Sequence, residues 1–550
     1  MVVSILTACY TRVKVNSRFF RPQTNTLHAA AILMLTVLLS RLLGLLRDRF
    51  LAAAFFNQHT SWQLDVYFAA FRLPDMIFQL LAVGAFSAAL IPVFSQYLVK
   101  AKTEAWHVAS SVITIGLSLF ILLGGLLVIF VAPLNRLIAP GFSAAQLQLM
   151  NDLTRILVIA QASFLVSNFF TGILQSYQYF LVPAFSPIAY NLGIIFGIVC
   201  LGPALGIYGP ALGVVLGAVL HLLVQLPLVK ALGYHYRISF DWHHPGVRRI
   251  GRLMLPRTLA LAVGQIELTL AVFLATSLSA GSLAIFYFAQ NLNSVAVGLF
   301  GASIGQAILP VLSREAGQTG SKFSRLLINA LNQTLYLSLP AGMFLLILRI
   351  PAVRLAFGAP NFPWAATLLT GKVVAILAVS VFAQCAIQVL VRGFYSLSNT
   401  RTPLYISIWS VALNVLLSLL FIYQLRLGVP GLALAVSLSS FFQTGLLGYY
   451  LYRLSGGWPL MLLVAPFTKM AAATLITGFS LWLPLRFLDR YILNTARTLD
   501  LIILTLVTGL IGLAVYLGLS KLLQIRELND FVKLFRRLTR FEPLIEEPIP

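Results

Sequence analysis

Four charged side chains interrupt the first long apolar stretch of the sequence. Arg41, Arg47, Asp48 and Arg49 follow twelve residues, 29–40, that carry only apolar, small or hydroxyl side chains. A charge inside a bilayer costs roughly 2.5–3.5 kcal/mol on insertion scales, so these groups should face water or one another. Guanidinium groups bind phosphate oxygens through paired hydrogen bonds. Arg41 and Arg47 are therefore candidate ligands for an anionic diphosphate headgroup.

The same cluster also allows a purely structural interpretation. Arg41 and Asp48 are seven residues apart, which places them on one helix face about 10 Å apart, whereas Arg47 points about 120° away. An Arg–Asp pair, with the other arginines extending toward the helix end, would satisfy the charges without a ligand. Gly44, between them, would allow a neighbouring helix to approach closely. Both interpretations remain open at this stage.

The second apolar segment also carries charges. It begins at Asp65 and contains Arg72, Pro74 and Asp75. Pro74 breaks the backbone hydrogen-bond ladder and predicts a kink, and a kinked helix that lines a cavity could move. Asp65 is either the N-cap of this helix or a functional carboxylate. We assign Asp65 and Arg72 to substrate binding, and Asp75, with Asp48, to gating or coupling.

A third charged segment begins the second half of the sequence. Arg257 and Glu267 are ten residues apart and lie on nearly opposite helix faces, so they do not form a local pair. Arg257 is a candidate substrate ligand. Glu267 could carry a coupling proton or sodium ion, or it could pair with Arg41 or Arg47.

Composition explains why these charges stand out. The chain has 550 residues, of which 59% are hydrophobic and 10% charged, whereas soluble proteins have about 25% charged residues. The net charge of +23 comes from short basic loops rather than from a basic domain, which argues against nucleic-acid binding. An enzyme would need paired carboxylates or a metal site, and no acidic pair stands in an outer connection. We therefore expect neither an enzyme nor a resident cofactor.

The apolar segments predict an all-α membrane protein. About 20 apolar residues are needed to cross a bilayer as a helix, and fourteen segments reach that length. They are 29–56, 65–98, 107–132, 150–180, 184–204, 208–231, 250–279, 283–312, 323–349, 366–396, 402–424, 430–453, 460–487 and 499–522.

An internal repeat organises these segments. Residues 89–95 (ALIPVFS) resemble 307–313 (AILPVLS), and 206–212 (GIYGPAL) resemble 428–434 (GVPGLAL), with almost the same length of sequence between the members of each pair. Six helices per repeat give both halves the same orientation, as in transporters that bind substrate between two lobes. The predicted domains are a tail (1–28), an N-lobe of six helices (29–232), a linker (233–249), a C-lobe of six helices (250–455), helices 13 and 14 (456–523) and an amphipathic tail (524–550).

Basic residues predict the orientation. Lys and Arg gather in 230–252, 313–325 and the tail after 522, all on the side of the N-terminus, whereas 57–64 and 280–282 have none. The positive-inside rule then makes both termini cytoplasmic. Arg486, Arg490 and Arg497 would lie on the outer side and argue the other way. The tail is expected to lie on the cytoplasmic leaflet.

Four motifs resemble those of the MurJ (MviN) lipid II flippases. They are SRLLGLLRD (Ser40–Asp48), DVYFAAFRLPD (Asp65–Asp75), GAFSAALIPVF (Gly84–Phe94) and GFYSLSNTRTP (Gly393–Pro403). The resemblance covers nearly the whole chain, including helices 13 and 14. It implies the fold of the multidrug/oligosaccharidyl-lipid/polysaccharide exporter superfamily, in the bacterial inner membrane.

The resemblance also implies a function in peptidoglycan biosynthesis and cell shape. Members flip undecaprenyl-diphosphate-linked disaccharide-peptide to the outer leaflet by alternating access, coupled to membrane potential or to a cation such as sodium or a proton. By motif, Arg41 and Arg47 match the cavity arginines of the family, and Asp65 matches its functional aspartate. Membrane lipids, the lipid-linked glycan and cell-wall synthesis proteins are the expected partners.

Two departures from the family pattern leave an alternative open. Many members have cavity arginines where this chain has MIFQ (Met76–Gln79), and an ADR run where it has AQN (Ala289–Asn291). Arg72 and Arg257 are candidates to replace them. Otherwise the chain is a related transporter of another lipid-linked oligosaccharide or amphiphile.

Overall fold

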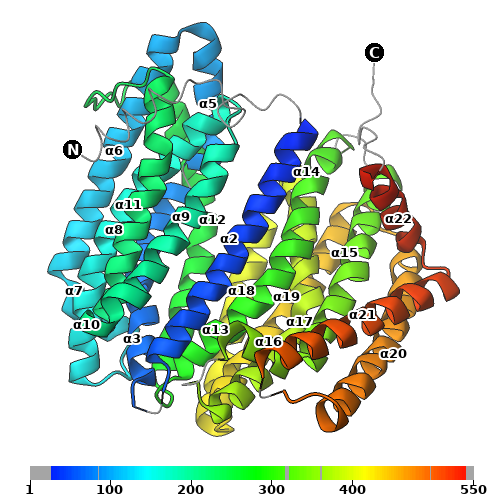
Figure 1. Ribbon diagram of the computed structural model, residues 1–550. Coiled ribbons are helices and arrows are strands. Elements are labelled where there is room, and N and C mark those ends of the chain that lie inside the picture. The colour runs from blue at the N-terminus through cyan, green and yellow to red at the C-terminus, as the bar shows by residue number, and fades with distance from the viewer. Residues whose placement is uncertain are drawn as a thin grey trace. The chain divides into compact units, whose positions relative to one another are not determined.

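The computed structural model describes residues 26–57, 59–83, 86–315, 321–358, 362–495 and 497–539. Residues 1–25 and 540–550 of the predicted tails, and Gly84 and Ala85 of one motif, lie outside this part. Within it the chain is helical and has no strand (Figure 1). The prediction of an all-α fold is therefore confirmed.

Contacts divide the chain into two compact units, Met1–Ala284 with Ala359–Asn361, and Ile285–Gly358 with Phe362–Pro550. The first unit thus includes the segment 250–279, which the sequence assigns to the second lobe. The predicted lobe boundaries stay a prediction.

The helices of the first unit, with two π-helical turns (η), follow in chain order. They are α2 (Thr26–Phe55), α3 (Ser61–Ala70), α4 (Arg72–Phe78), η2 (Gln79–Val83), α5 (Phe86–Lys100), α6 (Lys102–Ile129), α7 (Val131–Ile138), α8 (Ala144–Ser176), α9 (Leu181–Phe196), η3 (Gly197–Leu201), α10 (Gly202–Leu205), α11 (Tyr208–Ala231) and α12 (Pro245–Thr276).

The second unit begins within α13 and continues to α22. Its elements are α13 (Ser282–Ala296), η4 (Val297–Ala302), α14 (Ser303–Glu315), α15 (Ser321–Ile347), α16 (Arg349–Phe357), α17 (Trp364–Ser396), α18 (Arg401–Leu419), η5 (Leu420–Gln424), α19 (Val429–Leu454), α20 (Met461–Tyr491), α21 (Thr498–Leu522) and α22 (Arg526–Thr539).

Eleven helices in the described part are long and apolar enough to cross a membrane. The three other predicted spans correspond to α2, to the broken run α3–α5, and to α12. These segments carry the intramembrane charges or a break in the helix. The charges that make these segments candidates for function therefore also lower their hydropathy below that of a simple apolar span.

The helices repeat along the chain as the motifs predict. The short helix α7 is followed by the long helix α8 in the first unit, just as the short helix α16 is followed by the long helix α17 in the second. The π-helical turns recur in matching places, η2 with η4 and η3 with η5. Gly206 and Gly428, both with positive φ, occupy matching turns. The duplication therefore extends to local backbone irregularities.

Glycines bring α9 and α11 together in the first unit. A Cβ on Gly193 of α9 would lie 2.4 Å from the Cα of Gly217, and one on Gly197, the first residue of η3, would lie 2.5 Å from the Cα of Gly213. Small residues four apart on both helices let the two backbones touch. This close packing fixes the position of α9, which carries one of the site residues described below.

The C-terminal helix α22 packs on the second unit. The ring of Phe531 stacks on Tyr336 of α15, with centroids 5.6 Å apart, and Ile525, just before α22, is buried. Part of the apolar face that was expected to meet lipid therefore meets protein instead.

Candidate functional site

Arg47 and Asp48 form an ion pair on α2. Arg47 donates from Nε (2.9 Å) and Nη2 (2.7 Å) to Oδ1 of Asp48, whose side chain is 1% exposed. The third donor, Nη1, points to Oδ1 of Asn191 on α9 at 3.3 Å. The carboxylate thus pairs with its sequence neighbour rather than with Arg41, which helix geometry places on the same face.

Asn191 joins α2 to α9. Its amide nitrogen donates to the carbonyl oxygen of Ser40 at 3.2 Å and to that of Pro187 at 3.1 Å. A Cβ on Gly44 would lie 3.9 Å from its amide oxygen, so Gly44 permits the close approach that the sequence predicts. Asn191 was not predicted as a site residue, although a lone amide in an apolar helix is a usable signal.

Arg41 differs from Arg47 in its surroundings. Its side chain is exposed within the first unit, and it makes no hydrogen bond or ion pair with the residues that the structure describes. A guanidinium in the middle of a membrane helix needs water or an anion. Arg41 is thus the more available of the two predicted headgroup ligands.

Arg72 and Asp75 lie together at the start of α4. The α3–α4 helix is interrupted at Phe71, in the turn before Pro74, where a kink is predicted. Arg72 is buried, interacts electrostatically with Asp75, and donates to Gln265 on α12. These contacts make Arg72 part of the packing between α4 and α12.

Asp65 caps a helix far away in the sequence. Its Oδ2 accepts from the backbone N–H of Gly281 at 2.6 Å, and its Oδ1 accepts from Ala284 at 2.8 Å. Both donors are at the start of α13, where an anion is favoured by free N–H groups and the helix dipole. The interpretation of Asp65 as the N-cap of its own helix is wrong, because α3 begins four residues earlier, at Ser61.

The two candidate residues of α12 remain apart. Glu267 is half-buried and has no hydrogen bond or ion pair with the described residues. Arg257 is on the same helix, but its side chain lies outside the described part of the structure. The structure brings Arg47 together with Asp48 and Arg72 with Asp75, and it joins neither pair to Glu267.

A second polar network lies between α8 and α11. Ser167 Oγ is 2.6 Å from Nδ1 of His221 and accepts from Gln225 Nε2 at 2.9 Å, and Thr171 donates to Gln225 at 3.0 Å. Sequence analysis did not single out these residues. They satisfy one another's polar groups and stabilise the packing of the first unit.

Comparison with known proteins agrees with the motifs. Residues 51–499 match the family model described as "Lipid II flippase MurJ". The chain belongs to the MurJ family of lipid II flippases. A protein of Buchnera aphidicola subsp. Baizongia pistaciae, "Probable lipid II flippase MurJ", is 30% identical over 77% of this chain and 83% of its own length. "Lipid II flippase MurJ" of Burkholderia cenocepacia is 27% identical over 88% and 94%.

Solved structures confirm the fold of this MurJ family member. "Lipid II flippase MurJ, inward closed conformation" superposes with a TM-score of 0.74 at 24% identity, covering 90% of this chain and 98% of that one. An inward-facing MATE transporter of the MOP superfamily gives 0.63 at 15% identity, over 76% and 94%. The family consists of transporters rather than enzymes.

Proposed function

We propose that this protein is a lipid II flippase of the bacterial inner membrane, with both termini in the cytoplasm. It would move undecaprenyl-diphosphate-linked disaccharide-peptide from the inner to the outer leaflet by alternating access. The match to the family model over residues 51–499 carries this proposal. Peptidoglycan synthesis enzymes, as suppliers and consumers of the substrate, are its expected partners.

In this proposal the arginines of α2 have separate tasks. Arg41 is exposed and meets the diphosphate first, because its guanidinium donors are available. Arg47 already donates to Asp48 and Asn191, so phosphate oxygens must compete with a carboxylate for it. Such competition keeps the headgroup from binding too tightly, and a carrier must also release its substrate.

Coupling to a cation or to the membrane potential would supply direction. Glu267 is the candidate, as a half-buried carboxylate without an ion pair to the described residues. Binding and release of a proton or sodium ion at this carboxylate would change the local charge.

The departures from the family pattern support a second candidate function. In the stretch 76–79, where many members of the family carry arginine, Gln79 ends the run and donates to Asp75 at 3.4 Å. A neutral amide there favours a substrate with less anionic charge near α4. This alternative is a MOP-type transporter of another lipid-linked oligosaccharide or amphiphile.

Rescue of a flippase-depleted bacterium tests the main proposal. Arg41→Ala and Arg47→Ala should each fail to restore growth, whereas Arg155→Ala, which removes a half-exposed arginine on α8, should restore it. All variants must reach equal levels in the membrane. Rescue by both α2 variants would contradict the headgroup role. Mass spectrometry of lipid that co-purifies with the protein separates the two candidate substrates.

A further inference from the structure

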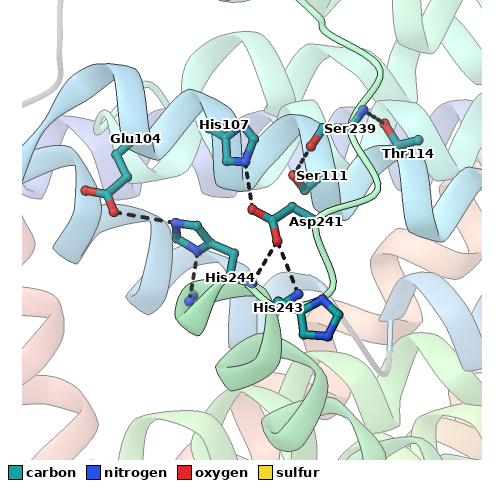
Figure 2. A network of polar contacts seen from close by, with 9 residues as sticks. Glu104, His107, Ser111, Thr114, Ser239, Asp241, His243 and His244 are labelled. Carbon is teal, nitrogen blue, oxygen red and sulfur yellow. Dashed lines mark hydrogen bonds and ion pairs between the residues drawn. The ribbon is translucent and has the colours of Figure 1, made fainter.

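The segment between α11 and α12 runs along the outside of α6. Four contacts hold it there: Tyr234 with Ser110, Tyr236 with Thr114, Ser239 with Ser111, and Asp241 with His107. Their polar atoms are 3.4, 3.0, 2.8 and 3.1 Å apart, respectively. Figure 2 shows the last two of these contacts, with the further hydrogen bond from the Ser239 backbone N–H to Thr114.

These contacts cover a polar stripe on a membrane helix. Ser111 and Thr114 are buried, as is every residue from Val108 to Thr114. Leu122 is eleven residues after Ser111, which is almost the same helix face, and it is 59% exposed. Lipid would therefore contact this face of α6 at Leu122. At Ser111 the segment covers the same face and excludes lipid from it.

The position along α6 puts the segment at the edge of the bilayer core. The apolar stretch of α6 runs from about Val112 to Ile129, so Thr114 lies just inside it and His107 lies just before it. The hydroxyl groups of Ser111 and Thr114 would be costly against acyl chains. The segment forms hydrogen bonds with these two hydroxyl groups, and its opposite side faces away from α6.

That outward side is apolar. Ile238, Phe240 and Trp242 are 77%, 54% and 57% exposed. They alternate in the sequence with Ser239 and Asp241, which contact Ser111 and His107 of α6, so the side chains between these contacts are left exposed. Tryptophan, the last of the three, is enriched at the membrane–water interface.

The surrounding charges favour an anionic surface. One acidic residue, Asp241, stands in 230–252 against five basic ones: Lys230, Arg237, Arg248, Arg249 and Arg252. The hydrogen bond from His107 holds the pKa of the Asp241 carboxyl below its usual range. Asp241 also accepts hydrogen bonds from the backbone N–H groups of His243 and His244. Donors within the segment therefore compensate its negative charge.

We propose that residues 236–242 form an interfacial anchor that inserts Ile238, Phe240 and Trp242 into a leaflet rich in anionic phospholipid. Apolar insertion sets the depth, and the basic residues select anionic headgroups. The anchor lies in the segment that joins the two sequence repeats, so it ties that joint to the bilayer.

Spin labels on the full-length protein in vesicles test the insertion. In a background without native cysteines that still rescues growth, labels are placed by Ile238→Cys and Phe240→Cys, with His235→Cys as the water reference and Leu122→Cys as the lipid reference. Collision rates with oxygen at 238 and 240 should be several times those at 235 and close to those at 122. Rates at 238 and 240 equal to those at 235, with free access of a water-soluble nickel chelate, would overturn the proposal.

Lipid composition tests the charge preference. Adding phosphatidylglycerol to phosphatidylcholine vesicles should lower nickel-chelate access at 238 and 240 severalfold. The double variant Arg248→Gln, Arg252→Gln should lose this change and keep the oxygen contact. An unaltered depth on adding the anionic lipid would refute the anionic partner, and loss of oxygen contact in the double variant would refute insertion by apolar side chains.

Discussion

The two repeats have the same order of helices but carry different charges on their first helices. Within its apolar stretch α2 carries Arg47 beside Asp48, whereas α12 carries Glu267. Arg47 is paired with Asp48, whereas Glu267 is followed by Leu268. A duplicated scaffold has therefore received a cationic site in one copy and a lone carboxylate in the other.

The amides of α9 and α18 show the same divergence. Asn191 lies six residues before η3, and Asn414 lies six residues before η5. Asn191 accepts from Arg47, whereas Asn414 donates to Ser439 at 3.2 Å and accepts from Ser418 at 3.3 Å. One position thus supports a charged site in the first unit and a neutral hydroxyl cluster in the second.

Asp48→Ala should give the largest loss of stability. It removes a buried carboxylate that binds two nitrogens of Arg47, and breaking such a pair costs about 3 kcal/mol. Glu267→Gln, at the equivalent helix, should change stability by less than ~0.5 kcal/mol because no ion pair to the described residues is lost. Thermal unfolding in detergent measures both. Equal losses would break the proposed contrast between the repeats.

Gly197→Ala should have the next largest effect. Its Cβ would meet backbone atoms of Gly213 and Gly209 at 2.5 and 2.6 Å, and overpacking of this kind costs about 1–3 kcal/mol. The equivalent residue at the start of η5 is Leu420, which is 39% exposed, so Leu420→Ala should be nearly neutral. Unfolding temperatures compare them, and a neutral Gly197→Ala would show that α9 and α11 can move apart freely.

Asn191→Ala and Asn414→Ala sharpen the comparison further. Loss of a hydrogen bond to a charged group costs roughly 1.5 kcal/mol or more, and loss of a neutral one about 1 kcal/mol. Asn191→Ala should also weaken rescue of flippase-depleted cells, because it removes one partner of Arg47. If Asn414→Ala were the more destabilising of the two, the assignment of the charged site to the first unit would lose support.

The exposed ion pairs should matter least. Lys322→Ala removes a 2.7 Å pair with Glu315 in the second unit, and Arg155→Ala removes a 3.0 Å pair with Asp152 in the first. Each should cost at most ~1 kcal/mol, and less at high salt, because water screens such pairs. Unfolding at two salt concentrations checks this. A large loss in either unit would mean that the pair is more than a surface contact.

Local sequence predicted the helices, their duplication and the charged segments, because apolar length, recurring motifs and isolated charges are local signals. It could not predict which residues form hydrogen bonds with the charged side chains. Asp65 meets Gly281, and Arg72 meets Gln265, through contacts between residues that are far apart in the chain. Helix geometry alone predicted that Arg41 lies beside Asp48. In the structure the side chain of Arg47 instead donates to Asp48, the next residue in the chain.

The cap that Asp65 places on α13 has a consequence for biosynthesis. When the ribosome has delivered only the first six predicted spans to the membrane, this carboxylate has not yet met its partners, because Gly281 and Ala284 have not been made. The first unit therefore cannot reach its final form until translation has entered the second repeat. A nascent chain released before residue 284 would retain an acidic group without these backbone donors among apolar helices.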